Sequence, residues 1–318
     1  MSKRLTITII ASLAVIAAGF LVVGASIAPL SFPGPTTINI APGTTLSQTA
    51  DLLKNQGLIR STWMYKIYAV LIDGGTRGVK SGQYLFDSPQ SVLRIAYRTT
   101  HGLEGFPLVK VTIPEGLNSL EIGVAIKKVL PNFDETSFET AAKNHEGYLF
   151  PDTYFWPTNV SVQQVIADMQ TIFQSRLSGA MATINHFGQP LDQVIKMASI
   201  VEKEATSTTD RRIVAGILWH RLATGMALQV DPPFAYFLNK PLDQLTLADL
   251  KTESPYNLYL HTGLPPTPID NPGLEAILDT VEPINTQYWF YLSGDDGVMH
   301  YATTLAGHNA NKAKYLKS

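Results

Sequence analysis

One carboxylate in this chain stands in surroundings that suit proton transfer. Glu146 lies in the segment His145-Glu-Gly-Tyr-Leu-Phe-Pro-Asp-Thr-Tyr-Phe155, which is rich in aromatic residues and too apolar for an ordinary surface. Burial disfavours the charged form of a carboxyl group, so the pKa of Glu146 is expected to rise toward the range of a general acid near neutral pH. Flat aromatic faces pack well against sugar rings, and the segment offers several: Tyr148, Phe150, Tyr154 and Trp156. These features indicate glycosidic bond chemistry; the alternative is a buried, hydrogen-bonded glutamate at the start of an aromatic core strand.

Two further carboxylates are candidate partners of Glu146. The pattern of apolar residues predicts a helix over residues 191–205, and Glu202 and Glu204 flank its apolar stripe on opposite sides. A carboxylate in such a position is often solvated or paired with a nearby Lys or Arg, and this structural role is the alternative for both residues.

Proline-rich loops follow in the second half of the chain. Gln229 and Asp231 come just before Pro232 and Pro233, which make a stiff loop that could hold polar side chains toward a ligand. Segments 254–259 and 263–273 have the same character. Rigid loops of this kind suit an extended binding groove, although ordered connections with no function are the alternative.

The common signatures of other chemistries are absent from the sequence. There is no HExxH, because position 149 is Leu, and no GxSxG, SxxK or glycine-rich phosphate loop. The histidines are scattered, so neither a metal nor a cofactor is expected. The chain has no cysteine and therefore no disulfide or thiolate nucleophile. A net charge of -2, with no basic run after Lys3 and Arg4, argues against nucleic acid as a partner.

The N-terminus reads as a membrane anchor. Residues 5–30 carry no charge and are mostly Ile, Val, Leu and Ala. This run is long enough to cross a bilayer, because about 20 apolar residues are sufficient. No convincing cleavage site ends the run, so we expect a cytoplasmic tail over residues 1–4 and an uncleaved transmembrane helix over 5–30. Lys3 and Arg4 would stay inside, which places the rest of the chain on the outer face of the cytoplasmic membrane as a single-pass protein. A buried core helix is the alternative.

Two regions of mixed structure follow the anchor, and the fold class is α+β. In residues 31–108, a Pro- and Gly-rich linker precedes a small unit with predicted strands 37–41 and 81–86 and predicted helices 45–56, 63–71 and 91–99. In residues 109–318, a strand near 110–113 precedes a helix that begins at the capping box Asn118-x-x-Glu121. Helices are predicted from residue 161, over 191–205 and over 210–222. Beyond residue 228 we expect loops and a closing strand pair that includes 288–292.

Several separate motifs occur in a fixed order over about residues 36–318. They are Glu146-Gly-Tyr-Leu-Phe-Pro-Asp-Thr-Tyr154, Ala198-Ser-Ile-Val-Glu-Lys-Glu204, Met226-Ala-Leu-Gln-Val-Asp-Pro232, Ser254-Pro-Tyr-Asn-Leu-Tyr259, Gly263-Leu-Pro-Pro-Thr-Pro-Ile269 with Asn271-Pro-Gly273, and Thr303-Leu-Ala-Gly-His-Asn309. In this respect the chain resembles the YceG-like endolytic murein transglycosylases, membrane-anchored lyases of the bacterial cell wall. Pro233 and Gly307 depart from residues that are frequent in the family, which leaves the roles of their loops open.

The resemblance implies an N-terminal membrane helix, a LysM-like subdomain within residues 31–108 and a catalytic domain over 109–318, with Glu146 as the essential acid. It implies that the partners are peptidoglycan glycan strands, the cytoplasmic membrane and, by analogy, the peptidoglycan synthesis machinery. Candidate substrate-binding residues are Tyr148, Asp152, Tyr154, Glu202, Glu204, Gln229, Asp231, Tyr256 and Asn257.

The reaction implied by the resemblance needs only one acid. Glu146 would protonate the leaving oxygen of the β-1,4 bond and then take the proton from the 6-hydroxyl of N-acetylmuramic acid, giving a 1,6-anhydro end without water. Glu202, Glu204 or Asp152 could stabilise the positive transition state. Two alternatives stay open: a hydrolase that uses Glu146 with Glu202 or Glu204 and water, and a non-catalytic, membrane-tethered wall-binding protein.

Overall fold

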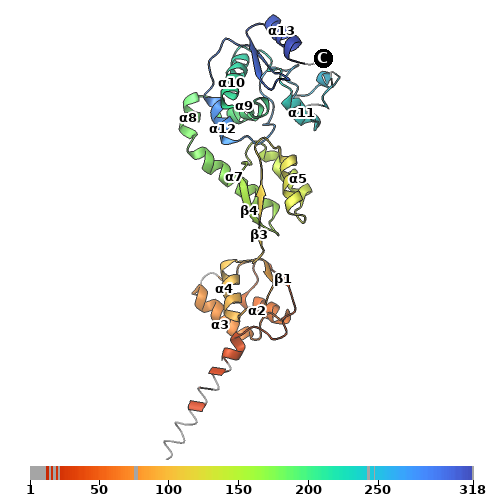
Figure 1. The fold of residues 1–318 in the computed structure, drawn as a ribbon. Helices are drawn as coiled ribbons and strands as arrows, with labels where there is room; N and C mark the ends of the chain where they lie inside the picture. Colours follow the sequence, from red (N-terminus) through yellow and green to blue (C-terminus); the bar gives the residue numbers. More distant parts are fainter. Residues whose placement is uncertain are drawn as a thin grey trace, which may run out of the picture. The chain divides into compact units, whose positions relative to one another are not determined.

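The computed structural model describes residues 12–13, 16, 19–20, 22–74, 78–241, 244–246 and 248–316. The chain divides into two compact units, Met1–Pro107 and Leu108–Ser318, and each is described by itself (Figure 1). Helices and small antiparallel sheets alternate in both. The predicted mixed α+β class is therefore confirmed.

The first unit folds helices around a two-stranded sheet. β1 (Thr36–Ile40) pairs antiparallel with β2 (Gly82–Phe86), and the core beneath them is made with α2 (Leu46–Asn55), α3 (Thr62–Asp73) and α4 (Val92–His101). Hydroxyl N-caps start these helices, since the side chains of Thr45, Ser61 and Ser91 each accept a hydrogen bond from the first turn. The strands and helices lie where the sequence predicts them, and the LysM-like character of the unit stays a prediction.

Part of the predicted transmembrane span, including residues 5–11, lies outside the described residues. Among the residues that are described, no helix combines the length and the apolar character needed to cross a bilayer. Residues 22–26 are helical, and Ala25 and Phe32 pack against the core of the first unit.

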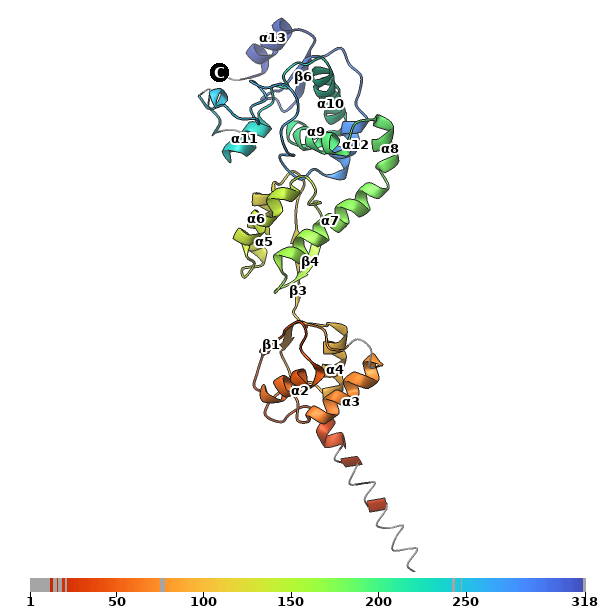
Figure 2. The same ribbon diagram turned by 180° about the vertical axis from the view of Figure 1, so that it is seen from behind.

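The second unit begins with a two-stranded sheet covered by helices on two sides. β3 (Leu108–Thr112) pairs antiparallel with β4 (Thr153–Pro157). This sheet lies between α7 (Val162–Ser178) on one side and α5 (Ser119–Val129) with α6 (Glu135–Ala142) on the other, as Figure 2 shows. All five elements supply side chains to one apolar core. This part carries the loop with Glu146, which follows the short 3-10 helix η1 (Lys143–His145).

A second group of helices completes the unit. α9 (Leu191–Glu204) packs against α10 (Thr208–Ala223) and α12 (Leu274–Val281), with α8 (Met181–Phe187) beside them. β5 (Phe290–Ser293) and β6 (Met299–Ala302) form the predicted closing strand pair, which α13 (Leu305–Tyr315) contacts.

The expectation that loops dominate beyond residue 228 is wrong in part. The structure has α11 (Pro232–Leu238), the 3-10 helix η3 (Asp249–Lys251), α12 and α13 in this region. Pro232 and Pro233 start α11, because proline is tolerated in the first turn of a helix, where its missing N–H leaves no bond unmade. Helices of seven or eight residues, such as α11 and α12, also give too few turns for a clear apolar period.

Candidate active site

Glu146 is held inside the second unit with only 3% of its surface exposed. The first residue of α5 contacts both carboxylate oxygens: the Ser119 N–H donates to Oε1 at 3.0 Å and to Oε2 at 3.1 Å. The Ser119 hydroxyl donates to Oε2 at 2.8 Å. The first N–H groups of a helix have no partner within the helix, and the positive end of its dipole attracts negative charge. The start of α5 is therefore a site where a buried carboxylate is stabilised.

The sequence places the start of α5 through its cap. Asn118 accepts a hydrogen bond from the Glu121 N–H, and the Glu121 side chain accepts one from the Asn118 N–H. This is the capping box that the sequence predicts. It fixes the helix end beside Glu146 without using the Ser119 N–H.

Asn271 connects the Glu146 loop to the rest of the site. Its side-chain amide donates to Oε1 of Glu146 at 2.8 Å and to the Leu117 carbonyl at 3.0 Å. Its Oδ1 accepts hydrogen bonds from the N–H groups of Gly147 (2.9 Å) and Leu149 (2.8 Å). With every polar atom of the amide in use, a buried Asn271 fixes the loop backbone and the carboxylate together.

Tyr236 of α11 completes the set of donors. Its hydroxyl donates to Oε2 of Glu146 at 3.2 Å, the longest of these contacts. Burial raises the pKa of Glu146 above the ordinary value, while the hydrogen bonds from Ser119, Tyr236 and Asn271 oppose the rise. The hydroxyls of Ser119 and Tyr236 can rotate to accept a hydrogen bond from the neutral acid, so the site can hold both protonation states.

Two neighbouring cavities lie on the side of Ser119 and Tyr236. One, of about 440 Å³, is lined by Ser119, Tyr236, Phe237, Tyr256 and others, and the second, of about 330 Å³, includes Lys203 and Lys240. Asn118, Tyr236 and Asn239 line both. The rings of Phe237 and Tyr256 stack at 5.9 Å with an interplanar angle of 15°. Aromatic faces beside polar groups at this volume are typical of a small-ligand pocket.

The other predicted carboxylates do not gather around Glu146. Asp152 and Glu202 line a separate cavity of about 730 Å³ with Arg176 and Arg211. Asp152 pairs with Arg176 at 2.6 Å; burial works against its charge, yet the arginine lowers its pKa. Glu202 accepts a hydrogen bond from the Gly273 N–H at 2.9 Å, and burial raises its pKa.

Glu204, Gln229 and Asp231 lie together in a third cavity, of about 400 Å³. Burial raises the pKa of Glu204 to about 7. The Tyr259 hydroxyl donates to Asp231 at 2.7 Å, and Gln229 has a positive φ of 52°, which is uncommon for a residue with a side chain. The two predicted glutamates of α9 therefore face different cavities.

The predicted aromatic and amide residues divide between core and surface. Tyr154 is buried, stacks on Trp156 at 4.5 Å and donates its hydroxyl to the Phe150 carbonyl. Asn257 is buried and donates to the carbonyls of Leu250 and Thr252. Tyr148 packs edge-on against Phe173 at 5.2 Å. Of the predicted aromatic residues, Tyr256 alone lines one of the two cavities beside Ser119 and Tyr236.

Sequence reasoning assigned no role to four residues near Glu146: Ser119, Tyr236, Asp270 and Asn271. Asp270 is fully buried, neither of its carboxyl oxygens has a hydrogen-bond partner, and its charge interacts with that of Glu146. Two signals were present in the sequence. The capping box marks a helix start at residue 119, and Asn271 begins the motif Asn271-Pro-Gly273. Neither signal predicts that these segments contact Glu146.

Comparison with known proteins agrees with the motif pattern. A model of the YceG-like family matches residues 38–314. The chain belongs to the YceG-like family. A relative from Bacillus subtilis (strain 168), named endolytic murein transglycosylase, is 30% identical over 96% of this chain and 92% of its own length.

Two further comparisons agree. A protein of the same name from Streptococcus pneumoniae (strain D39) is 25% identical over 89% of the chain, which spans 58% of that longer relative. The crystal structure of a YceG-like protein from Listeria monocytogenes superposes with a TM-score of 0.59 at 27% identity, covering 87% of this chain and 98% of that one.

Proposed function

We propose that this chain is an endolytic murein transglycosylase, a lyase that cuts the β-1,4 bond between N-acetylmuramic acid and N-acetylglucosamine and leaves 1,6-anhydro ends. Glu146 is its catalytic acid. The observation that carries the proposal is a buried carboxyl whose pKa is raised by burial and whose hydrogen-bond partners can serve both of its protonation states. The named relatives of the YceG-like family support the same reaction.

In the first step, the proton of Glu146 passes to the leaving glycosidic oxygen as the bond from that oxygen to the anomeric carbon breaks. The 6-hydroxyl oxygen of the same muramic acid residue then bonds to the anomeric carbon, and its proton passes to the Glu146 carboxylate. The acid is thereby regenerated, and no water is consumed. Hydrogen bonds from Ser119 and Asn271 stabilise the carboxylate between the two transfers.

The substrate reaches Glu146 from the side of Tyr236. The two cavities that share Asn118, Tyr236 and Asn239 form the candidate glycan groove, and the stacked rings of Phe237 and Tyr256 offer a face for a sugar. The Tyr236 hydroxyl makes the longest contact with the carboxylate, so the glycosidic oxygen can replace it at Oε2. We leave Tyr148, Tyr154 and Asn257 outside the proposed groove, because their rings and polar groups contact other residues of the chain.

A muramidase that uses water is the first competing function. It would need a second carboxylate across the scissile bond, and the candidates Glu202 and Glu204 line other cavities. Mass spectrometry of sacculi digested by the protein separates the two reactions, since an anhydro end is one water lighter than a reducing end. Products that carry reducing ends alone would rule out the lyase.

A wall-binding protein without activity is the second competing function. Glu146→Gln keeps the size of the side chain but replaces one acceptor oxygen by an NH2 group and has no proton to give, so we expect strand cleavage to be lost while binding to sacculi persists. Ser178→Ala, on the exposed surface of α7, serves as the control variant. Unchanged cleavage by Glu146→Gln would end the catalytic proposal.

The remaining parts of the proposal concern location. We propose that residues 5–30 form a single-pass anchor in the cytoplasmic membrane, that residues 31–108 are a LysM-like unit and that 109–318 act on nascent strands at the outer face of the membrane. Partnership with the peptidoglycan synthesis machinery is proposed by analogy with the family. Fractionation of cells and protease access from the outer face test the topology.

A further inference from the structure

The helix α3 of the first unit is apolar on two faces, and only one of them is used in the core. Met64, Tyr65 and Ala69 are buried against the rest of the unit. On the other face, an outer stripe consists of Trp63, Lys66, Ile67, Val70 and Leu71, which line a shallow hollow of about 370 Å³. Positions spaced by three and four residues lie on one side of a helix.

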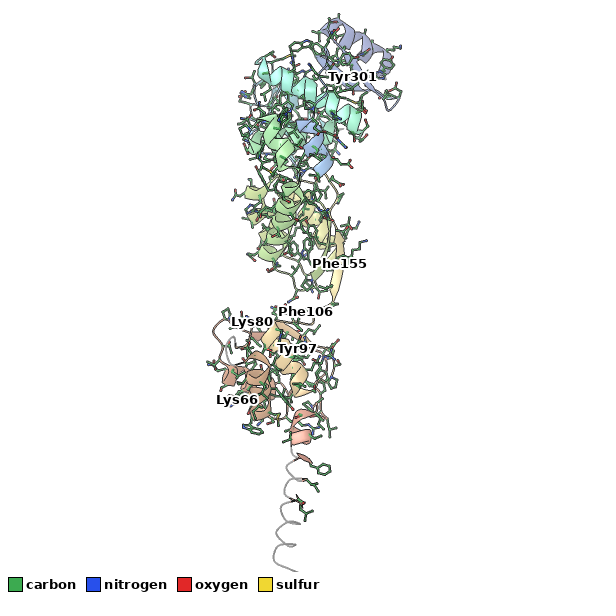
Figure 3. The ribbon with its side chains drawn as sticks, turned by 90° about the vertical axis from the view of Figure 1, so that its left-hand side faces the viewer. Lys66, Lys80, Tyr97, Phe106, Phe155 and Tyr301 are labelled. Atoms are coloured by element: carbon green, nitrogen blue, oxygen red, sulfur yellow. The ribbon has the colours of Figure 1, made fainter. Side chains whose placement is uncertain are left out.

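The outer stripe is open to solvent to an unusual degree. Trp63 is 61% exposed, Val70 48% and Leu71 73%. Large apolar side chains that gather in this way mark an interaction surface. Lys66 is the one charged member, and Figure 3 shows it at the outer edge of the first unit. In α3 itself, the one acidic residue is Asp73, which ends the helix.

The composition of the outer stripe fits a bilayer surface better than a sugar. Trp prefers the boundary between lipid and water, Lys can place its ammonium group among headgroups while its stem stays in apolar surroundings, and aliphatic side chains enter the acyl region. A glycan site would need several hydrogen-bonding groups for sugar hydroxyls. Within the stripe, only the Lys66 ammonium and the Trp63 indole N–H could supply them.

The position of α3 also favours a bilayer surface. Ser26 belongs to the proposed anchor, and its hydroxyl lies 2.9 Å from the Tyr68 hydroxyl in the middle of α3. Ala25 and Phe32, on either side of the end of the anchor, pack against the same core. The proposed anchor ends at residue 30, shortly after Ser26. Because each residue of chain spans at most about 3.6 Å, a helix that contacts Ser26 lies close to the end of the anchor and so at the edge of the bilayer.

We propose that the outer stripe of α3 rests in the interface of the cytoplasmic membrane and holds the first unit against the lipid surface. The inference rests on the proposed anchor, which tethers α3 beside the bilayer and so makes even a weak affinity of the stripe sufficient. The occupant is the lipid headgroup and acyl boundary, with anionic lipid favoured by Lys66.

Trp63 provides a direct probe, because the other three tryptophans of the chain, at positions 156, 219 and 289, belong to the second unit. The full chain is reconstituted into vesicles of phosphatidylglycerol and phosphatidylcholine, with or without lipids brominated near the ester end of the acyl chains. The difference in emission between the wild type and Trp63→Phe reports Trp63. We expect brominated lipid to quench this emission at least about twofold, as for an indole at the boundary of the bilayer.

A matched pair of variants tests the stripe as a surface. Val70→Asp puts a charge into the stripe, whereas Val124→Asp changes a valine of similar exposure, 51%, on α5 of the second unit. We expect Val70→Asp to abolish most of the quenching of Trp63 and Val124→Asp to leave it unchanged. Circular dichroism of both variants establishes that the fold is kept.

The failures of the two proposals are distinguishable. If the chain does not float with vesicles, the anchor is wrong and the lipid-bound stripe falls with it. If the chain floats but Trp63 is untouched by brominated lipid and is quenched freely by aqueous acrylamide, the stripe inference alone is overturned. A change in Trp63 emission on adding soluble glycan strands, with none from brominated lipid, would assign the surface to the wall instead.

Discussion

The amide of Asn271 holds the Glu146 carboxylate and the backbone that carries it in a single set of bonds. Its Nδ2 donates to Oε1 of Glu146 at 2.8 Å, and its Oδ1 accepts from the N–H groups of Gly147 and Leu149. One side chain therefore sets the position of the acid and contributes to its pKa.

Two replacements of Asn271 should separate its role in holding the loop backbone from its effect on the pKa of Glu146. Asn271→Leu leaves two buried N–H donors without a partner, and each costs about 1–3 kcal/mol of stability, so the melting temperature and the activity should both fall. Asn271→Asp keeps the acceptor for Gly147 and Leu149 but sets a second negative charge beside Glu146. The pKa of Glu146 then rises further, and the alkaline limb of kcat/KM should move to higher pH. A limb that stays in place would show that Asn271 does not face the acid.

Tyr236→Phe should change the pH profile in the same direction. The Tyr236 hydroxyl stabilises the charged form of Glu146 and lowers its pKa, so its loss allows burial to raise that pKa further. Activity depends on the protonated acid and declines as pH rises through this pKa. The alkaline limb should therefore move upward in Tyr236→Phe. Tyr256→Phe is the matched control, because Tyr256 lines the same cavity but its hydroxyl contacts Thr267. Equal shifts in both variants would contradict the assignment.

The sequence predicts the helices whose position is set by residues close to them in the chain. Hydroxyl caps and apolar periods locate α2, α3, α4 and α7 because these signals act within a few turns of the chain. The capping box at Asn118 likewise marks the start of α5. Short helices that begin at a proline, such as α11, or follow a glycine N-cap, such as α12, carry no such signal.

The candidate site depends on contacts between distant segments, which local patterns do not report. Ser119, Tyr236 and Asn271 are 27, 90 and 125 residues from Glu146 in the chain. The surroundings of Glu146 indicated burial, but the aromatic segment beside it supplies Tyr154 and Trp156 to the core, where a period-2 strand turns alternate rings inward. Aromatic composition alone does not separate these rings from the surface pair Phe237 and Tyr256.

Gly147 should tolerate no side chain. It has a φ of +88°, and a β-carbon there would clash with the ring of Pro268 and lie 2.9 Å from Cγ2 of Ile195. Gly147→Ala should therefore destabilise the fold by about 1–3 kcal/mol and displace the neighbouring Glu146, with a loss of activity. Gly179→Ala is the control, since its φ is -73° and nothing lies near its added β-carbon. Thermal unfolding and initial rates measure both, and a Gly147→Ala variant as active as Gly179→Ala would refute the argument.

Because Asp270 is buried, the free energy of unfolding of the protein should decrease as pH rises. Burial raises the pKa of Asp270 well above the ordinary value, and the charges of Glu202 and Glu146 add to this, while that of Lys203 opposes it. The folded chain thus keeps a proton that the unfolded chain releases above about pH 4. Stability falls with pH wherever the unfolded state binds fewer protons, by up to about 1.4 kcal/mol for each pH unit between the unfolded and the folded pKa.

Asp270→Asn removes this titration, so its stability relative to the wild type should grow as pH rises above about 4. Chemical denaturation at several pH values measures the difference. Asp152→Asn is the opposite case, because Arg176 lowers the pKa of Asp152 and the stability from that pair is present at neutral pH and lost as pH falls. The two variants should therefore depart from the wild type in opposite directions at neutral pH. A constant difference between Asp270→Asn and the wild type across the range would mean that Asp270 ionises in the folded protein as readily as in the unfolded chain.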